Sequence, residues 1–506
     1  MTAHSIAAMK RLANRYRDNY IATMNHVSDI EALLDQDATA CAEAIRSGEV
    51  SAVELTDASI ARIEAADPHL GAMTWERFER ARADASASPS GPFGGVPTMV
   101  KDHSTMAGEL ITYGNATFAA MQHRSSENSF LVDKFVDAGF VVLGATIPSE
   151  FGTSALTEPF GAPPVRNPWD DERNPGGSSG GAAVAVAAAY VPLAHGSDAG
   201  GSIRIPAAYC GLVGLKPSRG RVSGAPHNYG AGPVVEFGLC RSVRDAAGLL
   251  DVVSGPAPGD SIVAPPSATS FVEAMVQPLR PLRIGLWVDH PDGATAIDPA
   301  MKAGVEHAAK VLTEAGHHIE MSHPTCLDDF EHLVEVIQVM VSTSLHGGAL
   351  EIEQVLGRPV AVGDVEPLNL MLGQWGASVT GAQYAAALSA ADEYSYQAGQ
   401  WWSSGFDLLL CPVTAFGAPR NGEMVCTMDD PVAWFRSMAH YMAYTPMWNL
   451  TGQPAIAVPS LMVDGLPTSA QLVAAYGRED LLLQVAHQLE QRAPWLTIAP
   501  AYRYVR

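Results

Sequence analysis

One glycine-rich stretch, residues 174–206, constrains this chain more than any other part of it. It reads NPGGSSGGAAVAVAAAYVPLAHGSDAGGSIRIP and carries two glycine-flanked serine sites: Ser178 with Ser179 and, 24 positions after Ser178, Ser202. An apolar segment separates the two sites. Glycine lets backbone N–H groups turn inward and approach a ligand closely. Both sites therefore predict loops in which the main chain stabilises a negative charge.

Neither loop has the sequence of a nucleotide site. A phosphate loop needs a lysine after its glycines, and a dinucleotide fingerprint needs G-x-G-x-x-G after a strand. No lysine follows either cluster, and GGSSGG follows the polar run NPWDDERNP. Gly176, Ser178 and Gly180 do satisfy G-x-S-x-G, the nucleophile elbow between a buried strand and a helix. The charged, proline-containing segment before them does not predict such a strand, which makes the elbow the weaker interpretation.

A serine nucleophile needs a base, either a histidine or a lysine whose pKa has been lowered. The chain has few lysines: Lys10, Lys101, Lys134, Lys216, Lys302 and Lys310. Lys101 follows an apolar run in PFGGVPTMVKD, where burial would favour its neutral form. The alternative at this point is an ion pair of Lys101 with Asp102 or another carboxylate.

The overall charge disfavours one class of partner. The chain has 506 residues, 54 acidic against 31 basic side chains, and a formal net charge of −23. Binding to a phosphate backbone depends on clustered Lys and Arg, so we expect no nucleic-acid partner. With 47% hydrophobic residues, the chain is long enough and apolar enough to bury a large core.

The spacing of the cysteines and the length of the apolar runs indicate the expected cellular location of the protein. The six cysteines form no C-x-x-C pair, which favours a reducing, cytoplasmic location over a disulfide framework. The N-terminus has no apolar segment after its basic residues, so it does not predict a secretory signal. We identify residues 182–194 as the longest apolar run, which is too short to cross a bilayer, and we expect no membrane association.

Hydrophobic patterning predicts an α/β fold. The segment 38–68 has helical periodicity, with Ser51 as a cap of the second of two helices. From residue 95 onward, strand-like runs such as PTMV, VVLGAT, LRIGLWV, FDLLLCPV, QPAIAVPS and SAQLVAA alternate with helical segments, including those near 299–315, 383–403 and 479–490. This alternation favours a sheet covered by helices on both faces. The Pro/Gly/Ser-rich stretch 254–270 is the expected connector.

At this point the residues resemble a known family. GVPTMVKD and GGSSGGAAVAVAAAYVPLAHGSDAGGSIRIPAAYCGLVGLKPSRGRVS are similar to the two signature segments of the amidase signature family. The tail GQPAIAV…VAAYGREDLLLQVAHQLE resembles its nylon-oligomer branch. The resemblance implies a large mixed β-sheet covered by helices on both faces. It implies one domain over residues 31–506, after a helical extension over residues 1–30.

The resemblance also implies a Ser-Ser-Lys triad and an acyl-enzyme. By motif position Ser202 is the nucleophile, Ser178 the bridging serine and Lys101 the base. The implied oxyanion hole consists of the backbone N–H groups of Ala199, Gly200, Gly201 and Ser202. A cis peptide bond is implied between Gly177 and Ser178.

The remaining candidate residues are assigned to substrate contact, to loop structure or to no function. The family implies that Phe151, Gly152, Thr153 and Ser178 contact the substrate, and we expect the segment 344–353 to tune substrate choice. Ser179 is interpreted as a loop hydrogen-bonding residue, and Asp198 and Arg204 as structural. The histidine-rich segment 315–324 lacks HExxH, so we assign no metal, and no cofactor is implied.

The expected function is hydrolysis of a small linear or cyclic amide. The alternatives are urethanase or aryl acylamidase activity on carbamates, anilides or esters, the glutaminase subunit of a tRNA-dependent amidotransferase, and a non-catalytic binding protein. Ile205 disfavours the glutaminase, because that subunit type usually has a glutamine there. The partners expected are a small-molecule amide and, by resemblance, a second copy in a homodimer. The physiological substrate stays open.

Overall fold

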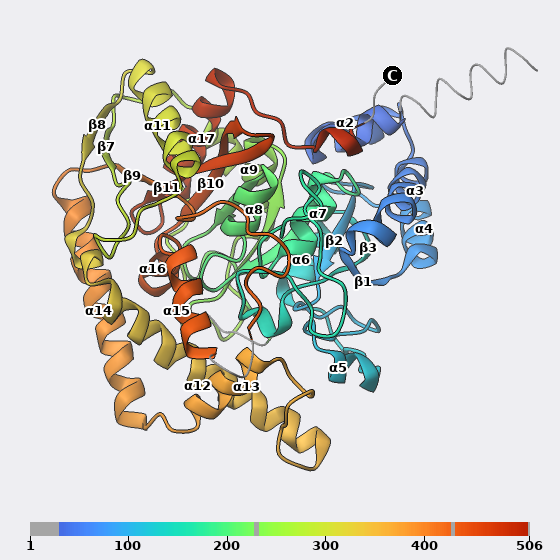
Figure 1. The fold of residues 1–506 in the computed structure, drawn as a ribbon. Coiled ribbons are helices and arrows are strands. Elements are labelled where there is room, and N and C mark those ends of the chain that lie inside the picture. Colours follow the sequence, from blue (N-terminus) through green and yellow to red (C-terminus); the bar gives the residue numbers. More distant parts are fainter. Residues whose placement is uncertain (1–29, 227–231, 427–430, 504–506) are drawn as a thin grey trace, which may run out of the picture.

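The computed structural model describes residues 30–226, 232–426 and 431–503, and one sheet runs through these residues (Figure 1). Its strand order is β1-β3-β2-β4-β6-β5-β10-β11-β9-β7-β8. The strands are β1 (Met73–Glu76), β2 (Pro97–Lys101), β3 (Val141–Thr146), β4 (Leu193–Asp198), β5 (Val213–Lys216), β6 (Val235–Cys240), β7 (Arg283–Leu286), β8 (His318–Met321), β9 (Leu408–Cys411), β10 (Ala455–Val463) and β11 (Leu466–Ala474).

The sheet is mixed, as predicted. β2 pairs in parallel with β3 and β4, and β7 pairs in parallel with β8 and β9. The pairs β1–β3, β4–β6, β5–β6, β5–β10, β10–β11 and β9–β11 are antiparallel. Strands on either side of the connector 254–270 thus belong to one sheet, and this connector links α9 to α10.

The helices surround the sheet, which extends from β8 at one side of Figure 1 to β1 at the other. They are α2 (Ala38–Ser47), α3 (Ala52–Leu70), α4 (Phe78–Ser86), α5 (Ala116–Met121), α6 (Phe130–Asp137), α7 (Gly180–Ala187), α8 (Arg204–Cys210), α9 (Val243–Val253), α10 (Phe271–Met275), α11 (Pro299–Glu314), α12 (Phe330–Leu356), α13 (Pro367–Gly376), α14 (Gly381–Ser403), α15 (Pro431–Tyr441), α16 (Pro446–Thr451) and α17 (Glu479–Arg492), with 3-10 turns η1 (Glu150–Gly152), η2 (Thr325–Asp328) and η3 (Pro500–Tyr502). The helices predicted near 299–315, 383–403 and 479–490 are confirmed as α11, α14 and α17.

Contacts with β11 show that helices cover both faces. Arg204 of α8 donates to the Gln471 side chain, whereas a Cβ on Gly304 of α11 would meet the Thr468 side chain. Residues 468 and 471 point to opposite faces, because side chains alternate along a strand. α8 and α11 therefore lie on opposite sides of the sheet.

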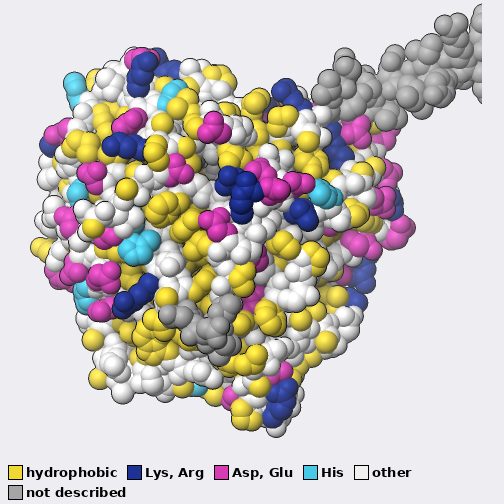
Figure 2. All heavy atoms as spheres, viewed as in Figure 1, with side chains coloured by type: hydrophobic (Ala, Val, Ile, Leu, Met, Phe, Trp, Pro, Cys, Tyr) yellow, Lys and Arg dark blue, Asp and Glu magenta, His cyan; other side chains and the backbone are white. Residues whose placement is uncertain are grey.

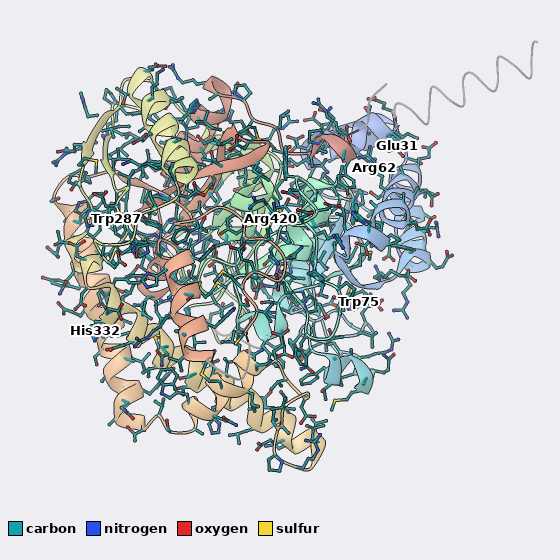
Figure 3. All side chains as sticks on the ribbon, in the orientation of Figure 1. Glu31, Arg62, Trp75, Trp287, His332 and Arg420 are labelled. Atoms are coloured by element: carbon teal, nitrogen blue, oxygen red, sulfur yellow. The ribbon has the colours of Figure 1, made fainter. Side chains whose placement is uncertain are left out.

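The described chain begins with the two predicted helices, α2 and α3. Ser51 caps α3 in a capping box with Glu54. Arg62 of α3 binds Glu31 at 2.6 Å and Asp35 at 2.8 Å, which fastens the first described residues to α3 (Figure 3). The helical extension predicted for residues 1–30 lies, except for residue 30, outside the described residues.

Helices α12, α13 and α14 form a helical layer beyond the sheet, seen at the bottom and left of Figure 1. By length and composition, α12 is the one helix among the described residues that would fit a membrane span, a feature the sequence analysis did not identify. In the structure α12 packs against α13 and α14. Figure 2 shows acidic and basic side chains scattered among apolar ones over the visible face.

Candidate active site

Lys101 is the last residue of β2, which lies between β3 and β4 inside the sheet. Every residue of β2 is buried, and the Lys101 side chain has no solvent exposure. The alternative of an ion pair with Asp102 is wrong, because both Asp102 carboxylate oxygens bind Thr112 instead. The sheet therefore places Lys101 in the interior of the protein. Among the described residues, no carboxylate forms a hydrogen bond with its amine.

Two serine hydroxyls surround the Lys101 amine. Nζ lies 2.7 Å from Ser178 Oγ and 2.9 Å from Ser197 Oγ. Burial lowers the pKa of Lys101 to about 7, although the charges of Glu236 and Asp198 act to raise it. A neutral amine offers one lone pair and two N–H donors, so it can accept from one hydroxyl and donate to the other. The arrangement suits a general base near neutral pH.

Lys216, the other lysine with a fully buried side chain, has a different environment. Its Nζ donates to the carbonyl oxygen of Pro217 at 2.9 Å. Burial also lowers the pKa of Lys216 well below its ordinary value. No hydrogen bond links this amine to a serine hydroxyl within the described ranges, so Lys101 alone combines burial with a serine relay.

The Ser178 loop leads into α7. No strand element lies between η1 and α7 in the described residues, so the nucleophile elbow is excluded. The Gly177–Ser178 peptide bond is cis, as the resemblance implied. Gly176 has φ +85°, and a Cβ there would lie 3.0 Å from Pro206 Cα. Glycine at this position therefore lets the two serine loops approach each other.

The Ser202 loop joins β4 to α8 and contacts the first loop through the backbone. Ser179 N donates to the Ser202 carbonyl at 3.3 Å, and Ser178 and Ser202 are both buried. Ser179 Oγ donates to the Ser197 carbonyl, which agrees with its predicted loop role. Across the described part of the chain, no hydrogen bond joins the Ser178 and Ser202 hydroxyls. The second link of the relay therefore stays a prediction.

Asp198 and Arg204 form a buried ion pair that organises the Ser202 loop. Arg204 binds both oxygens of Asp198 at 2.9 Å and reaches Gln471 and Asn449. Burial would raise the pKa of Asp198, but Arg204 lowers it well below its usual range. The carboxylate also accepts the backbone N–H groups of Gly201 and Ile203. This pair fixes the turn in which Ser202 lies.

One of the four expected oxyanion donors is already engaged. The Gly201 N–H donates to Asp198 Oδ1 at 2.7 Å, so we no longer count it as a donor to substrate. Thr445 donates to the Gly200 carbonyl oxygen at 2.7 Å. This bond fixes the carbonyl end of the same Gly200–Gly201 peptide group. The sequence suggested four equivalent donors because it gives no indication of where each N–H points.

A cavity of about 810 Å³ lies near the Ser178 loop, although neither Ser178 nor Ser202 is among its lining residues. Phe151 lines it, and a Cβ on Gly152 would lie 3.3 Å from Ser178 Oγ and 2.8 Å from the His103 ring, which also lines the cavity. Thr153 donates to the Asn369 side chain at 2.6 Å rather than lining the cavity itself. The segment 344–353, now seen as part of α12, contributes to the opposite wall.

Sequence reasoning missed three residues of this region. Ser197 contacts the Lys101 amine, His195 Nδ1 accepts from Lys101 N at 3.1 Å, and Asn449 donates to the Asp198 carbonyl at 2.8 Å. The sequence contained a signal for Ser197 and His195. Both lie in HGSD, directly before the nucleophile loop, and residues two apart on a strand share a face. Asn449 comes from α16 and has no such signal.

Comparison with known proteins places the chain in a family. Residues 54–483 match the family profile described as Amidase. The chain belongs to the amidase signature family. It is 39% identical to the 6-aminohexanoate-cyclic-dimer hydrolase of Paenarthrobacter ureafaciens, over 92% of this chain and 96% of that one. It is 34% identical to the putative amidase AmiC of Mycobacterium leprae, over 94% and 98%.

Solved amidase structures share the fold. A 6-aminohexanoate cyclic dimer hydrolase aligns with TM-score 0.88 at 39% identity, covering 93% of this chain and 99% of that chain. A bacterial aryl acylamidase aligns with TM-score 0.83 at 26% identity, covering 93% and 98%. As an amidase, the protein is a hydrolase of carbon–nitrogen bonds in amides.

Proposed function

We propose that this amidase cleaves small linear or cyclic amides through a Ser202 acyl-enzyme, with Ser178 and Lys101 as the proton relay. Neutral Lys101 takes the proton of Ser178 as Ser178 takes that of Ser202, while Ser202 Oγ bonds to the amide carbonyl carbon. The carbon–nitrogen bond then breaks, and the relay returns a proton to the leaving amine. Water hydrolyses the resulting ester with the same groups as base and acid.

The observation that carries this proposal is the buried Lys101 amine, which lies 2.7 Å from Ser178 Oγ and has a pKa of about 7. A lysine with an ordinary pKa would be protonated at neutral pH and unable to accept a proton. The backbone contact between the two serine loops brings Ser202 to the same region. These contacts support the triad assignment.

The developing oxyanion would be stabilised by backbone N–H groups of the turn after β4. We assign this role to Ala199, Gly200 and Ser202 and leave out Gly201, whose N–H binds Asp198. Donors fixed in place before the reaction need no reorganisation when charge develops. The ion pair of Asp198 with Arg204 supplies that rigidity.

The cavity supports a mainly uncharged aliphatic substrate. Its walls include Phe118, Phe151, Ile352 and Leu370, and its lining residues include Glu351 and Glu353 but no lysine or arginine. An apolar wall favours the methylene segments of an aliphatic amide. Two relatives, at 39% and 40% identity, are 6-aminohexanoate-cyclic-dimer hydrolases, which supports a nylon-oligomer or similar amide as the first substrate to test.

Anilides are the second candidate class. The fold matches that of an aryl acylamidase, and the cavity carries Tyr113, Phe118 and Phe151 in edge-on and tilted aromatic contacts near His103. Aromatic walls of this kind suit an aryl leaving group. A hydrolysis screen over aliphatic amides, nylon oligomers, anilides, carbamates and glutamine separates these classes.

Ser202→Ala tests the proposal directly. We expect it to lower turnover of every amide that the enzyme cleaves by about 10³-fold or more, since it removes the nucleophile. Ser179→Ala is the matched control and should retain most of the activity, because Ser179 contacts only the backbone of the site. Retention of more than a few per cent of turnover by Ser202→Ala would overturn the assignment.

A further inference from the structure

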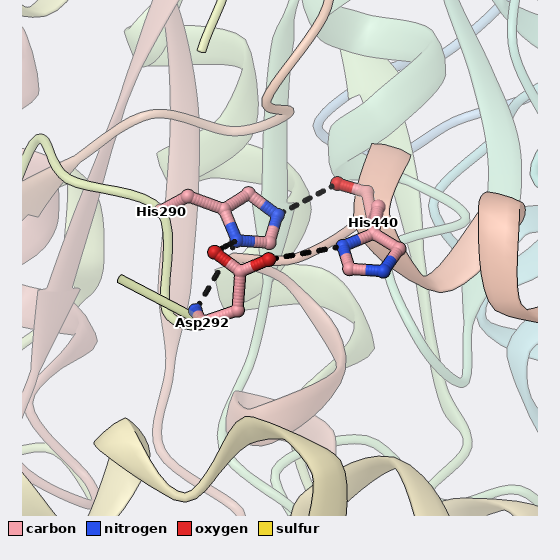
Figure 4. A group of neighbouring side chains, drawn as sticks. All are labelled: His290, Asp292 and His440. Carbon is pink, nitrogen blue, oxygen red and sulfur yellow. Dashed lines mark hydrogen bonds and ion pairs between the residues drawn. The ribbon is translucent and has the colours of Figure 1, made fainter. Parts of the chain in front are cut away.

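Three side chains outside the active site form a compact cluster of metal-ligand type. His290 and Asp292 follow β7, and His440 lies in the last turn of α15 (Figure 4). One ligand atom from each lies within 4.8 Å of the other two. This cluster was not predicted from the sequence, because 150 residues separate the two histidines.

The hydrogen bonds of His290 leave its Nδ1 as an electron-pair donor. Nε2 lies 3.3 Å from the carbonyl oxygen of His440, and a carbonyl can only accept, so Nε2 carries the proton. The Asp292 N–H donates to Nδ1 at 3.2 Å, which requires a lone pair there. A hydrogen bond from the other ring nitrogen to a carbonyl fixes the tautomer of metal-binding histidines in this way.

The same Nδ1 lies 2.8 Å from Asp292 Oδ1. Two atoms that both present lone pairs repel at this separation unless a proton or a cation is shared between them. The carboxylate does not turn away, because Thr295 and the backbone N–H of Ala294 hold both of its oxygens. A cation bound between the two side chains would remove this repulsion, and it would replace the Asp292 N–H as the partner of the Nδ1 lone pair.

His440 offers the third ligand. Its Nδ1 is buried and has no hydrogen-bond partner among the described residues, and it lies 3.6 Å from Asp292 Oδ2, beyond hydrogen-bond reach. Its side chain is 33% exposed, which leaves one side open for entry of an ion and for a water ligand. The cluster is therefore a nearly complete metal site in which one ligand atom, His440 Nδ1, has no hydrogen-bond partner among the described residues.

We propose that His290, Asp292 and His440 bind a divalent transition-metal ion of the zinc type. Zinc binds imidazole nitrogen and carboxylate oxygen at about 2.0–2.2 Å, which places ligand atoms about 3.3 Å apart in a tetrahedral site. The separation of His290 Nδ1 from Asp292 Oδ1 is 2.8 Å, and that of His440 Nδ1 from the other carboxylate oxygen, Oδ2, is 3.6 Å, on either side of that distance. Two imidazoles favour zinc, nickel or copper over the hard cations magnesium and calcium.

The site joins the segment after β7 to α15, the helix that precedes Thr445 in the chain. Tyr441, next to His440, accepts from Ala415 N, and Thr445 shortly after binds the Gly200 carbonyl. The ion would cross-link these segments and take no part in the chemistry at Ser202. Its binding should therefore raise thermal stability and leave turnover nearly unchanged.

The test is zinc binding by the metal-free full-length protein, followed by titration calorimetry and thermal unfolding. We expect one zinc per chain and a higher unfolding midpoint with zinc than without it. His290→Gln and His440→Gln should each weaken binding about tenfold or more. His318→Gln, in the exposed histidine-rich segment, is the matched control and should leave affinity unchanged. Absence of binding at millimolar zinc, or loss of binding in His318→Gln only, overturns the proposal.

A second measurement does not depend on any variant folding correctly. Diethyl pyrocarbonate modifies accessible imidazole nitrogens, and peptide mapping locates each adduct. Zinc should slow modification of His440 and leave modification of the exposed His318 unchanged. Equal rates at His440 with and without zinc would contradict the proposal.

Discussion

Lys101 Nζ and the hydroxyl of Ser197 lie 2.9 Å apart, so the amine contacts a serine that is not one of the two expected in the relay. Ser197 is on β4, one residue before Asp198, and its side chain has no role in the sequence analysis. By accepting an N–H of the neutral amine, it leaves the lone pair free to face Ser178. We infer that Ser197 is a positioning residue for the base.

Ser197→Ala should lower kcat/KM by roughly two- to tenfold, since one net hydrogen bond is worth about 0.5–1.5 kcal/mol. Steady-state kinetics on any cleaved amide measures this effect. Ser469→Ala, a buried serine of β11, is the control and should leave kcat/KM unchanged. An unchanged value in Ser197→Ala would remove the positioning role.

The pH dependence should follow Lys101. Its pKa of about 7 predicts an acid limb in kcat/KM with a midpoint near pH 7, because the protonated amine cannot act as base. Glu236 raises the Lys101 pKa, so Glu236→Gln should move that limb to lower pH. Glu320→Gln on exposed β8 should not move it. A shift to higher pH in Glu236→Gln would contradict the electrostatic account.

The two glycines of the oxyanion turn should respond differently to alanine. A Cβ on Gly201 would lie 2.6 Å from Ile205 Cδ1, at φ +131°, whereas a Cβ on Gly200 would meet only the flexible end of Met442 within 3.2 Å. Gly201→Ala should therefore lower kcat by about 10²-fold or more, by displacing the donors beside it. Gly200→Ala should cost far less. Equal losses in the two variants would show that the turn is not ordered as described.

Removing one partner of the buried ion pair should destabilise the fold. Asp198→Ala leaves the Arg204 guanidinium buried without its carboxylate and should lower the free energy of unfolding by about 3–5 kcal/mol. Denaturant unfolding measures the loss. Asp137→Ala, at an exposed position of α6, serves as the control. A loss below about 1 kcal/mol would mean that Asn449 and Gln471 satisfy Arg204 by themselves.

Local patterns in the sequence predicted six of the eleven strands of the described sheet and a minority of its helices, but not their contacts. PTMV and VVLGAT form β2 and β3, and Ser51 caps α3, because alternation and capping depend on near neighbours. The Lys101 contacts with Ser178 and Ser197 join residues 77 and 96 positions apart, which depend on the strand order. The first was predicted from family resemblance, and the second was missed. The direction of the Gly201 N–H likewise depends on the turn geometry, which composition does not determine.

The proposed relay requires that Ser202 becomes a nucleophile only when Lys101 is neutral. The most direct measurement is the rate of covalent labelling by an alkyl sulfonyl fluoride across pH, with peptide mapping of the adduct. We expect a single adduct at Ser202 whose rate of formation rises with a midpoint near pH 7, and no labelling in Ser202→Ala. An adduct on another serine, or a labelling rate that does not fall as pH drops below 7, would contradict it.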